Sequence, residues 1–210
     1  PADQGWGGEA RIREERDGGD WARRVNFGGK FFDVDQVTAM AEGQLNKAKA
    51  LGVRTVVDGT PINLGRDIHL IREVSRRTGL NFIASTGFYY QEEPWLGMRD
   101  EEQIYDLLMG DCVDGIAGTD SRPGILKAGV ARAGLTPLLR KILHATGRAA
   151  KETGLPLLCH HDPAIRNGRE ILALLARCRV PPPQDHLGHT GATTATGQPS
   201  PTLERASELG

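Results

Sequence analysis

The amino-acid sequence predicts an α/β protein built on a parallel sheet, and three observations lead to this fold class. Segments in which apolar residues recur at helical spacing alternate with short apolar or β-branched runs. One phrase, made of a helix end, a glycine, a short apolar run and polar residues, recurs as KALGVRTVVDGT, RRTGLNFIASTG and KETGLPLLCHHD. Polar side chains stand where these runs stop. Such alternation is typical of βαβ units, whose parallel strands are covered by helices.

The elements of the first half follow from local signals. Apolar residues recur at helical spacing before Gly52, and a β-branched run within 53–60 then predicts a strand. Asp67 is suited to cap the start of the next helix, and Gly79 is suited to end it. The next strand is predicted at residues 81–87, NFIASTG. The residues expected on one face of the first helix are Val37, Met40, Ala41, Leu45 and Ala48.

The second half continues the alternation. A helix over roughly 101–109 leads to a strand at 124–130, and Thr136 followed by Pro137 predicts a helix start. That helix runs to Gly154 and is followed by a strand at 155–161. A helix at 168–178 and a short strand at 184–189 complete the series.

Composition divides the chain of 210 residues into three zones. Residues 1–30 are rich in glycine and charge, and we expect them to be poorly ordered. Residues 31–190 have a globular pattern and form the expected domain. Residues 191–210 are mostly small and polar, which predicts a low-complexity tail.

Several classes of function are disfavoured by the composition. The formal charge of -1 gives no basic surface for nucleic acid, and no apolar run approaches the ~20 residues that span a membrane. The amino-terminal residues have no apolar signal-peptide core, and the cysteines show no CxxC spacing. We therefore expect a cytoplasmic protein that contacts neither nucleic acid nor membrane.

Polar residues gather at the carboxyl ends of the expected strands. They are Asp58, Thr86, Lys127, His160 and His189. Parallel α/β folds bind their ligands at this edge, whether the sheet is open or closed into a barrel. The pattern therefore predicts a functional site formed by several strands.

Two of these residues are histidines at matching strand ends. Adjacent strands lie about 4.8 Å apart, so His160 and His189 could converge on one metal ion. His161 should point to the opposite side of its strand. The alternative is that both histidines are bonded to the backbone and have only a structural role.

Lys127 stands inside an apolar run, ILKAGV. A buried ammonium is costly, so such a lysine tends to be neutral, and it can act as a base, form a Schiff base or react with carbon dioxide to give an anionic carbamate. It can equally extend its amine into water at the strand end. Chemistry alone leaves these alternatives open. Tyr89 and Tyr90, just after a strand, suit either a pocket wall or simple packing.

These motifs together resemble the phosphotriesterase family of metal-dependent amidohydrolases, which includes phosphotriesterases, phosphotriesterase-like lactonases and phosphotriesterase-related proteins. The resemblance rests on VVDGTPINLGRDIHLIREVSRRTGLNFIASTGFYY, ILKAG, TGLPLLCHH with Gly168 downstream, and LGH, in this order between about Phe31 and Thr190. It implies a (β/α)8 barrel of the TIM type that carries two divalent metals, usually zinc, at the carboxyl ends of its strands.

The resemblance also implies roles for individual residues. Lys127 would be the carbamylated lysine that bridges the metals, and His160 and His189 would bind the more exposed one. Tyr89 would line the substrate pocket. A metal-bound hydroxide would then attack a phosphotriester, lactone or related ester bond. The expected partner is a small-molecule ester or lactone, with a homodimer as an open alternative.

The sequence also departs from the family pattern. It contains no His-x-His pair, and no histidine precedes His69. No strand pattern bearing the family's last-strand aspartate follows His189. We therefore expect an incomplete barrel holding roughly strands two to six, as a truncated or frame-shifted sequence would give, with one metal or none. Three functions stay open: a hydrolase, a catalytically dead homologue, and a module that binds a small anion.

Overall fold

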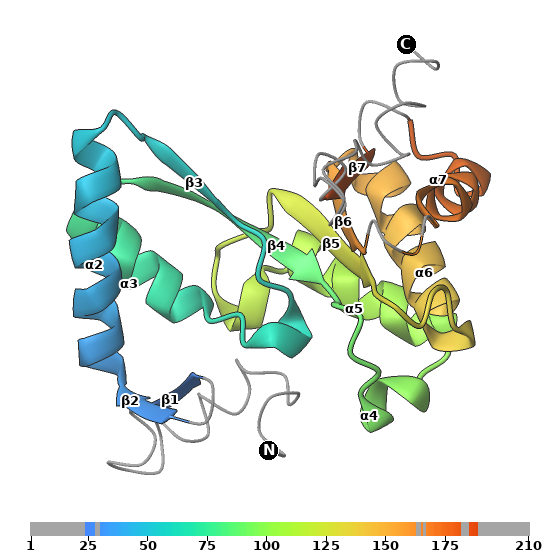
Figure 1. Cartoon of the computed structure of the whole chain (residues 1–210), viewed down its shortest axis with the longest axis horizontal. Coiled ribbons are helices and arrows are strands. Elements are labelled where there is room, and N and C mark those ends of the chain that lie inside the picture. The colour runs from blue at the N-terminus through green and yellow to red at the C-terminus, as the bar shows by residue number, and fades with distance from the viewer. Residues whose placement is uncertain (1–23, 28–29, 163–164, 166, 182–184, 189–210) are drawn as a thin grey trace.

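A computed structural model describes residues 24–27, 30–162, 165, 167–181 and 185–188 (Figure 1). A short antiparallel hairpin, β1 (Arg24–Phe27) and β2 (Lys30–Asp33), precedes the alternating part of the chain. The rest of the zone 1–30 and the tail 191–210 lie outside the described residues. The elements that follow the hairpin are α2 (Val34–Ala50), β3 (Thr55–Asp58), α3 (Ile68–Thr78), β4 (Asn81–Gly87), α4 (Pro94–Gly97), α5 (Glu101–Val113), β5 (Ile125–Val130), α6 (Pro137–Thr153), β6 (Leu157–His161), α7 (Gly168–Arg177) and β7 (Asp185–Gly188).

The five strands β3 to β7 form one parallel sheet in sequential order. The sheet curls, and α3, α5, α6 and α7 pack on its convex face (Figure 1). Sequential parallel strands with helices outside are the arrangement of a (β/α) barrel. The predicted fold class, an incomplete barrel of this type, is confirmed. Among the described residues, β3 and β7 are the two edges of the sheet.

Local hydrogen bonds explain why the helices begin and end where the sequence predicts. The Asp67 side chain accepts from the backbone N–H groups of His69 and Leu70, and Gly79 ends α3 with a φ of 66°. Thr136 caps α6 through Leu139 N–H, and the helix ends at Gly154. Helix α5 begins at the predicted residue but runs past 109 to Val113.

The two faces of the sheet have different surroundings. On the convex face, Leu126, Ala128 and Val130 of β5 pack in the main hydrophobic core with α5, α6 and α7. The alternate residues Lys127 and Gly129 therefore lie on the concave face. Val57 of β3, at a position paired with Ile83, is 54% exposed. The described strands thus leave apolar side chains of the concave face in contact with water.

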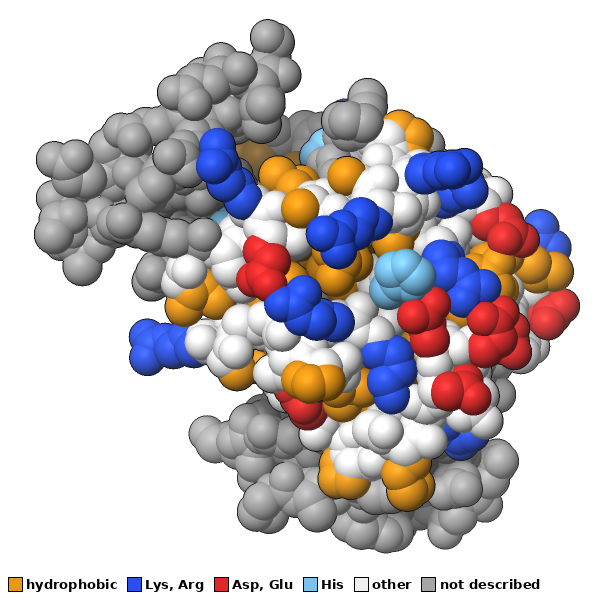
Figure 2. Space-filling view, turned by 90° about the vertical axis from the view of Figure 1, so that its right-hand side faces the viewer, with side chains coloured by type: hydrophobic (Ala, Val, Ile, Leu, Met, Phe, Trp, Pro, Cys, Tyr) orange, Lys and Arg blue, Asp and Glu red, His pale blue; other side chains and the backbone are white. Residues whose placement is uncertain are grey.

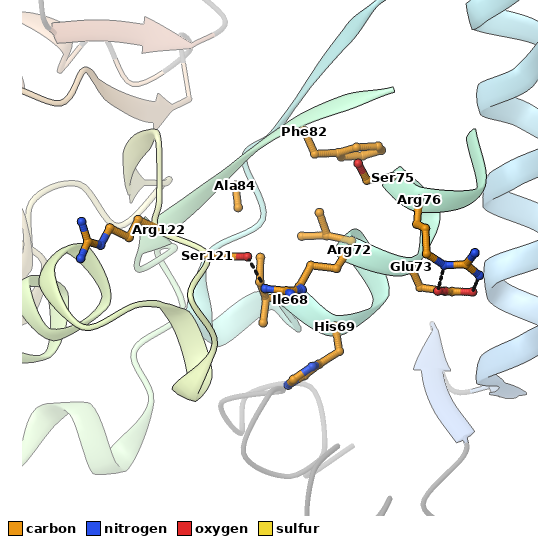
Figure 3. A pocket seen from close by; sticks show the side chains of 11 residues that line it. Ile68, His69, Arg72, Glu73, Ser75, Arg76, Phe82, Ala84, Ser121 and Arg122 are labelled. Carbon is orange, nitrogen blue, oxygen red and sulfur yellow. Dashed lines mark hydrogen bonds and ion pairs between the residues drawn. The ribbon is translucent and has the colours of Figure 1, made fainter. Parts of the chain in front are cut away.

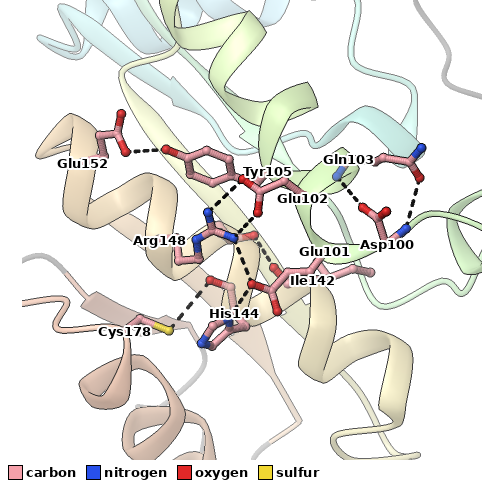
Figure 4. A network of polar contacts seen from close by, with 11 residues as sticks. Asp100, Glu101, Glu102, Gln103, Tyr105, Ile142, His144, Arg148, Glu152 and Cys178 are labelled. Carbon is pink, nitrogen blue, oxygen red and sulfur yellow. Dashed lines mark hydrogen bonds and ion pairs between the residues drawn. The ribbon is translucent and has the colours of Figure 1, made fainter.

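Polar contacts join α5 to α6 behind the sheet (Figure 4). The Arg148 guanidinium of α6 pairs with Glu101 and Glu102 at 3.1 and 2.8 Å and lies 4.3 Å from the centroid of the Tyr105 ring. His144 Nδ1 lies 2.7 Å from Glu101 Oε1. These contacts hold the helices that support β5.

The outer surface around α6 and α7 carries mixed charge. Basic and acidic side chains are interspersed over the face that Figure 2 shows, with hydrophobic side chains between them. Within the described part of the chain, no helix combines the length and apolar character needed to cross a membrane.

Candidate active site

Lys127 lies on the concave face of β5, and its side chain is only 9% exposed. Among the described residues, no hydrogen bond or ion pair reaches its amine. Burial lowers the pKa of this amine below its ordinary value. The low exposure favours the buried, chemically reactive lysine over the alternative in which the amine extends into water.

Gly87, at the end of β4, brings that strand unusually close to Lys127. The two residues are paired across the sheet, and a Cβ at position 87 would lie 1.8 Å from the Lys127 carbonyl oxygen. The next residue, Phe88, donates its N–H to the same oxygen at 3.0 Å. Only glycine permits this contact, which fixes the backbone that carries the lysine.

His160 lies on the same face of the neighbouring strand β6. It is paired with Gly129 on one side and Gly188 on the other, so neither neighbour brings a side chain against it. The histidine is half-buried. Since Gly129 is two residues beyond Lys127 on β5, the lysine and the histidine belong to adjacent strands of one surface. The structure therefore brings these two predicted site residues together.

The strand that leads to His189 is held beside His160. Gly188, the last residue of β7, is paired with His160, and His189 itself lies outside the described residues. His161 faces the other side of β6, as strand alternation predicts, and is 0% exposed. Its Nδ1 donates to the Gly188 carbonyl oxygen at 2.7 Å. Sequence reasoning missed this role, because periodicity does not reveal a bond to another strand.

Aromatic side chains cover the site on the side of β4. The ring centroid of Tyr89 is 4.9 Å from that of His160, and it lies 6.0 Å from Lys127 Nζ. Burial and the neighbouring Tyr90 raise the pKa of the Tyr89 hydroxyl. Tyr89 thus lies beside both predicted functional residues.

The other predicted strand-end residues belong to structural contacts. Thr86 donates its hydroxyl to Asp111 Oδ2 at 2.5 Å on the helix side of the sheet. Asp58 Oδ1 accepts from Thr60 N–H at 2.9 Å within its own turn. Arg66, which is 3% exposed, pairs with the same Asp111 oxygen at 2.7 Å. This buried pair anchors the loop after β3, and no pattern in the sequence indicates it.

The donors available for a metal ion are few in the described part of the chain. No group of three His, Cys, Asp or Glu side chains gathers there. Lys127 is not one of these four residue types, and His189 lies outside the described residues. Among the residues that the structure describes, the Lys127 amine has no acidic partner and lies on the strand next to His160. This arrangement is compatible with a divalent cation, because a carbamylated lysine would supply the missing anionic ligand.

A cavity of about 700 Å³ lies elsewhere, between α3 and the loop before β5 (Figure 3). Phe82 and Ala84 of β4 line it from the convex side of the sheet, and Arg72 donates to Ser121 across it at 2.9 Å. Since Lys127 and His160 lie on the opposite face, this cavity is separate from the candidate active site. The assignment of the site therefore depends on chemistry and register rather than on cavity size.

The fold defines a class of protein, the parallel (β/α) barrels, in which functional residues lie at the carboxyl ends of the strands. The sequence model of the phosphotriesterase family matches residues 25–203. The chain therefore belongs to the phosphotriesterase family.

Curated relatives have names that describe hydrolases or refer to phosphotriesterases. An aryldialkylphosphatase of Saccharolobus solfataricus is 33% identical over 164 residues, covering 77% of this chain and 52% of the relative. A phosphotriesterase homology protein of Mycobacterium tuberculosis is 34% identical over 194 residues, covering 88% and 60%. An N-acetyltaurine hydrolase of Mus musculus is 32% identical over 129 residues, covering 60% and 37%. The chain thus spans between about half and three fifths of the first two relatives.

Proposed function

We propose that this chain carries part of the active site of a metal-dependent hydrolase that acts on phosphotriester, lactone or related ester bonds. The observation that carries the proposal is the buried amine of Lys127, which has no acidic partner among the described residues and lies one strand from His160. Family membership and the relative named aryldialkylphosphatase support the class of reaction.

Lys127 would act as a metal ligand after modification. Burial lowers the pKa of its amine, which increases the neutral fraction at a given pH. The neutral nitrogen would attack the carbon of carbon dioxide, so that an N–C bond forms while one C=O π bond opens onto its oxygen, and the nitrogen would release a proton to water. The product is an anionic carbamate, which suits a cation far better than an ammonium does.

The remaining ligands in the proposal are imidazoles. His160, on the concave face, would supply one ring nitrogen, and His189 follows Gly188, the residue paired with His160. The ion would be zinc or another divalent metal, two per site in the family. When bound, such an ion lowers the pKa of a water molecule and polarises the bond under attack. Tyr89 would contact the part of the substrate that does not react.

Metal analysis tests the site directly. We expect purified protein, supplied with zinc and bicarbonate, to retain about one zinc per chain. His160→Ala and Lys127→Met should each abolish this retention. His144→Gln, which changes a histidine on α6 that faces Glu101, is the matched control and should leave it unchanged. If the wild type retains no stoichiometric zinc, and His160→Ala does not change the zinc content, the proposed site is refuted.

Hydrolysis of paraoxon and of an acyl-lactone tests the reaction. Zinc-dependent turnover that is lost in Lys127→Met would support the hydrolase. Zinc bound without turnover would instead identify a homologue that keeps ligands but lacks catalysis. Binding of a small anion in the absence of metal would support the third alternative, a binding module.

A further inference from the structure

The turn after β4 is fastened by one buried side chain, Asn63. This residue belongs to a short 3-10 helix, Ile62–Leu64, and it is 1% exposed. Its Oδ1 accepts from Tyr89 N–H at 2.7 Å, and its Nδ2 donates to the Gln91 carbonyl at 3.2 Å. The amide therefore joins both ends of the turn, using its acceptor and one donor.

The turn that Asn63 holds carries the aromatic side chains next to His160. The ring centroids of Tyr89 and Tyr90 are 4.3 Å apart, and those of Tyr90 and His160 are 5.9 Å apart in a stacked arrangement. Tyr89 approaches His160 at 4.9 Å. A shift of the turn would therefore move two rings away from the imidazole.

Gly129 receives the turn from the opposite side. A Cβ at this position of β5 would lie 2.9 Å from Tyr89 Cδ2 and 3.0 Å from the Tyr90 backbone nitrogen. The ring could rotate, but the backbone nitrogen could not retreat without moving the turn. The absence of a side chain at 129 thus lets the turn lie directly on the strand that carries Lys127.

The short helix that contains Asn63 is itself held in place by hydrogen bonds. Leu64 N–H donates to the Pro61 carbonyl at 3.0 Å, and Gly65 ends the short helix with a φ of 85°. Arg66, immediately beyond, donates to the Ser85 carbonyl of β4 at 3.0 Å. Asn63 is therefore attached to the barrel and can hold the turn in one place.

We propose that Asn63 is a positioning residue that, together with Gly129, holds the rings of Tyr89 and Tyr90 against His160. The two rings form an apolar wall beside His160. Such a wall favours a substrate whose group beside the ester bond is aryl or alkyl. This consequence for the substrate rests on the proposed function, whereas the positioning itself does not.

The positioning can be measured without metal or substrate. The chain has six histidines, so the ring C–H signals of His160 can be assigned in an NMR spectrum by their loss in His160→Gln. The benchmark for displaced rings is the double variant Tyr89→Leu, Tyr90→Leu. Asn63→Leu, which is nearly isosteric but makes neither hydrogen bond, should shift the His160 signals toward that benchmark.

Matched variants separate positioning from general loss of stability. Thr78→Val removes two buried side-chain hydrogen bonds, to Val74 O and Leu80 N, far from the turn, and should leave the His160 signals in place. Asn63→Asp keeps the acceptor for Tyr89 N–H and should restore the signals at least halfway. If Asn63→Leu fails to fold, Gly129→Ala provides the same test from the other side. Wild-type signals in Asn63→Leu, or in Gly129→Ala, would overturn the proposal.

Kinetics of the zinc-loaded protein test the consequence for the substrate. For an aryl ester, Asn63→Leu should raise KM about tenfold and leave kcat nearly unchanged, because the wall binds ground and transition states alike. Zinc content should stay at the wild-type level. An equal fall in kcat and kcat/KM would overturn this role. If wild-type protein shows no turnover, the proposed function fails, while the NMR comparison still decides the positioning.

Discussion

Replacement of Gly87 by alanine should break the contact that fixes Lys127. The wild-type residue has a φ of 139°, which residues with a side chain rarely adopt, and its Cα faces the Lys127 carbonyl. The added Cβ would lie 1.8 Å from that oxygen, far inside van der Waals contact. Either β4 or β5 must therefore move.

The size of the effect follows from two costs. The unfavourable backbone conformation contributes about 1–3 kcal/mol. Relief of the overlap by backbone shifts contributes about 1–3 kcal/mol more. The free energy of unfolding should thus fall by about 2–6 kcal/mol, against a total of about 5–15 kcal/mol for a typical domain. Movement of the Lys127 backbone should also weaken zinc binding.

Urea unfolding followed by circular dichroism measures the loss. Gly110→Ala is the matched control, because Gly110 lies inside α5 and a Cβ there would meet nothing within 4 Å. That variant should gain about 0.5–1 kcal/mol from helix propensity. If Gly87→Ala loses less than about 1 kcal/mol and binds zinc normally, the reasoning about this close approach is wrong.

Three further predictions concern the charged and polar groups around the site. Because burial lowers the pKa of the Lys127 amine below 10.5, the unfolded chain binds this proton more tightly, so metal-free stability should rise as the pH increases toward 10.5. Lys127→Met should lack this pH-dependent gain in stability, which urea midpoints measured at about pH 7 and about pH 10 will show. An equal change of midpoint between these two pH values in both proteins would contradict it. His161→Phe should lower the free energy of unfolding by about 1–3 kcal/mol, because the half-buried Gly188 carbonyl loses its donor, and an unchanged calorimetric midpoint would count against this. Arg66→Met should cost about 3–5 kcal/mol by leaving the Asp111 carboxylate without a cationic partner, and adding Asp111→Asn should recover part of the loss. Strictly additive effects in urea unfolding would argue against coupling.

The sequence was sufficient for most elements of the alternating part of the chain, and it supplied the candidates for the site residues. Helix limits at Asp67, Gly79, Thr136 and Gly154 depend on hydrogen bonds and φ values that are satisfied locally, so residue type alone indicates them. A lysine inside an apolar strand is equally visible in one dimension. The parallel order of the strands followed from their alternation with helices.

Only the tertiary structure decided which residues position the site. Asn63 contacts residues 26 and 28 positions away, and Arg66 meets Asp111 at a separation of 45. The glycines at 87 and 129 matter because other backbone segments approach them closely after folding. Hydrophobic periodicity reports which face of an element is buried, but it contains no distance between elements. The residues that bear the proposed chemistry could therefore be named from the sequence, whereas those that hold them in place could not.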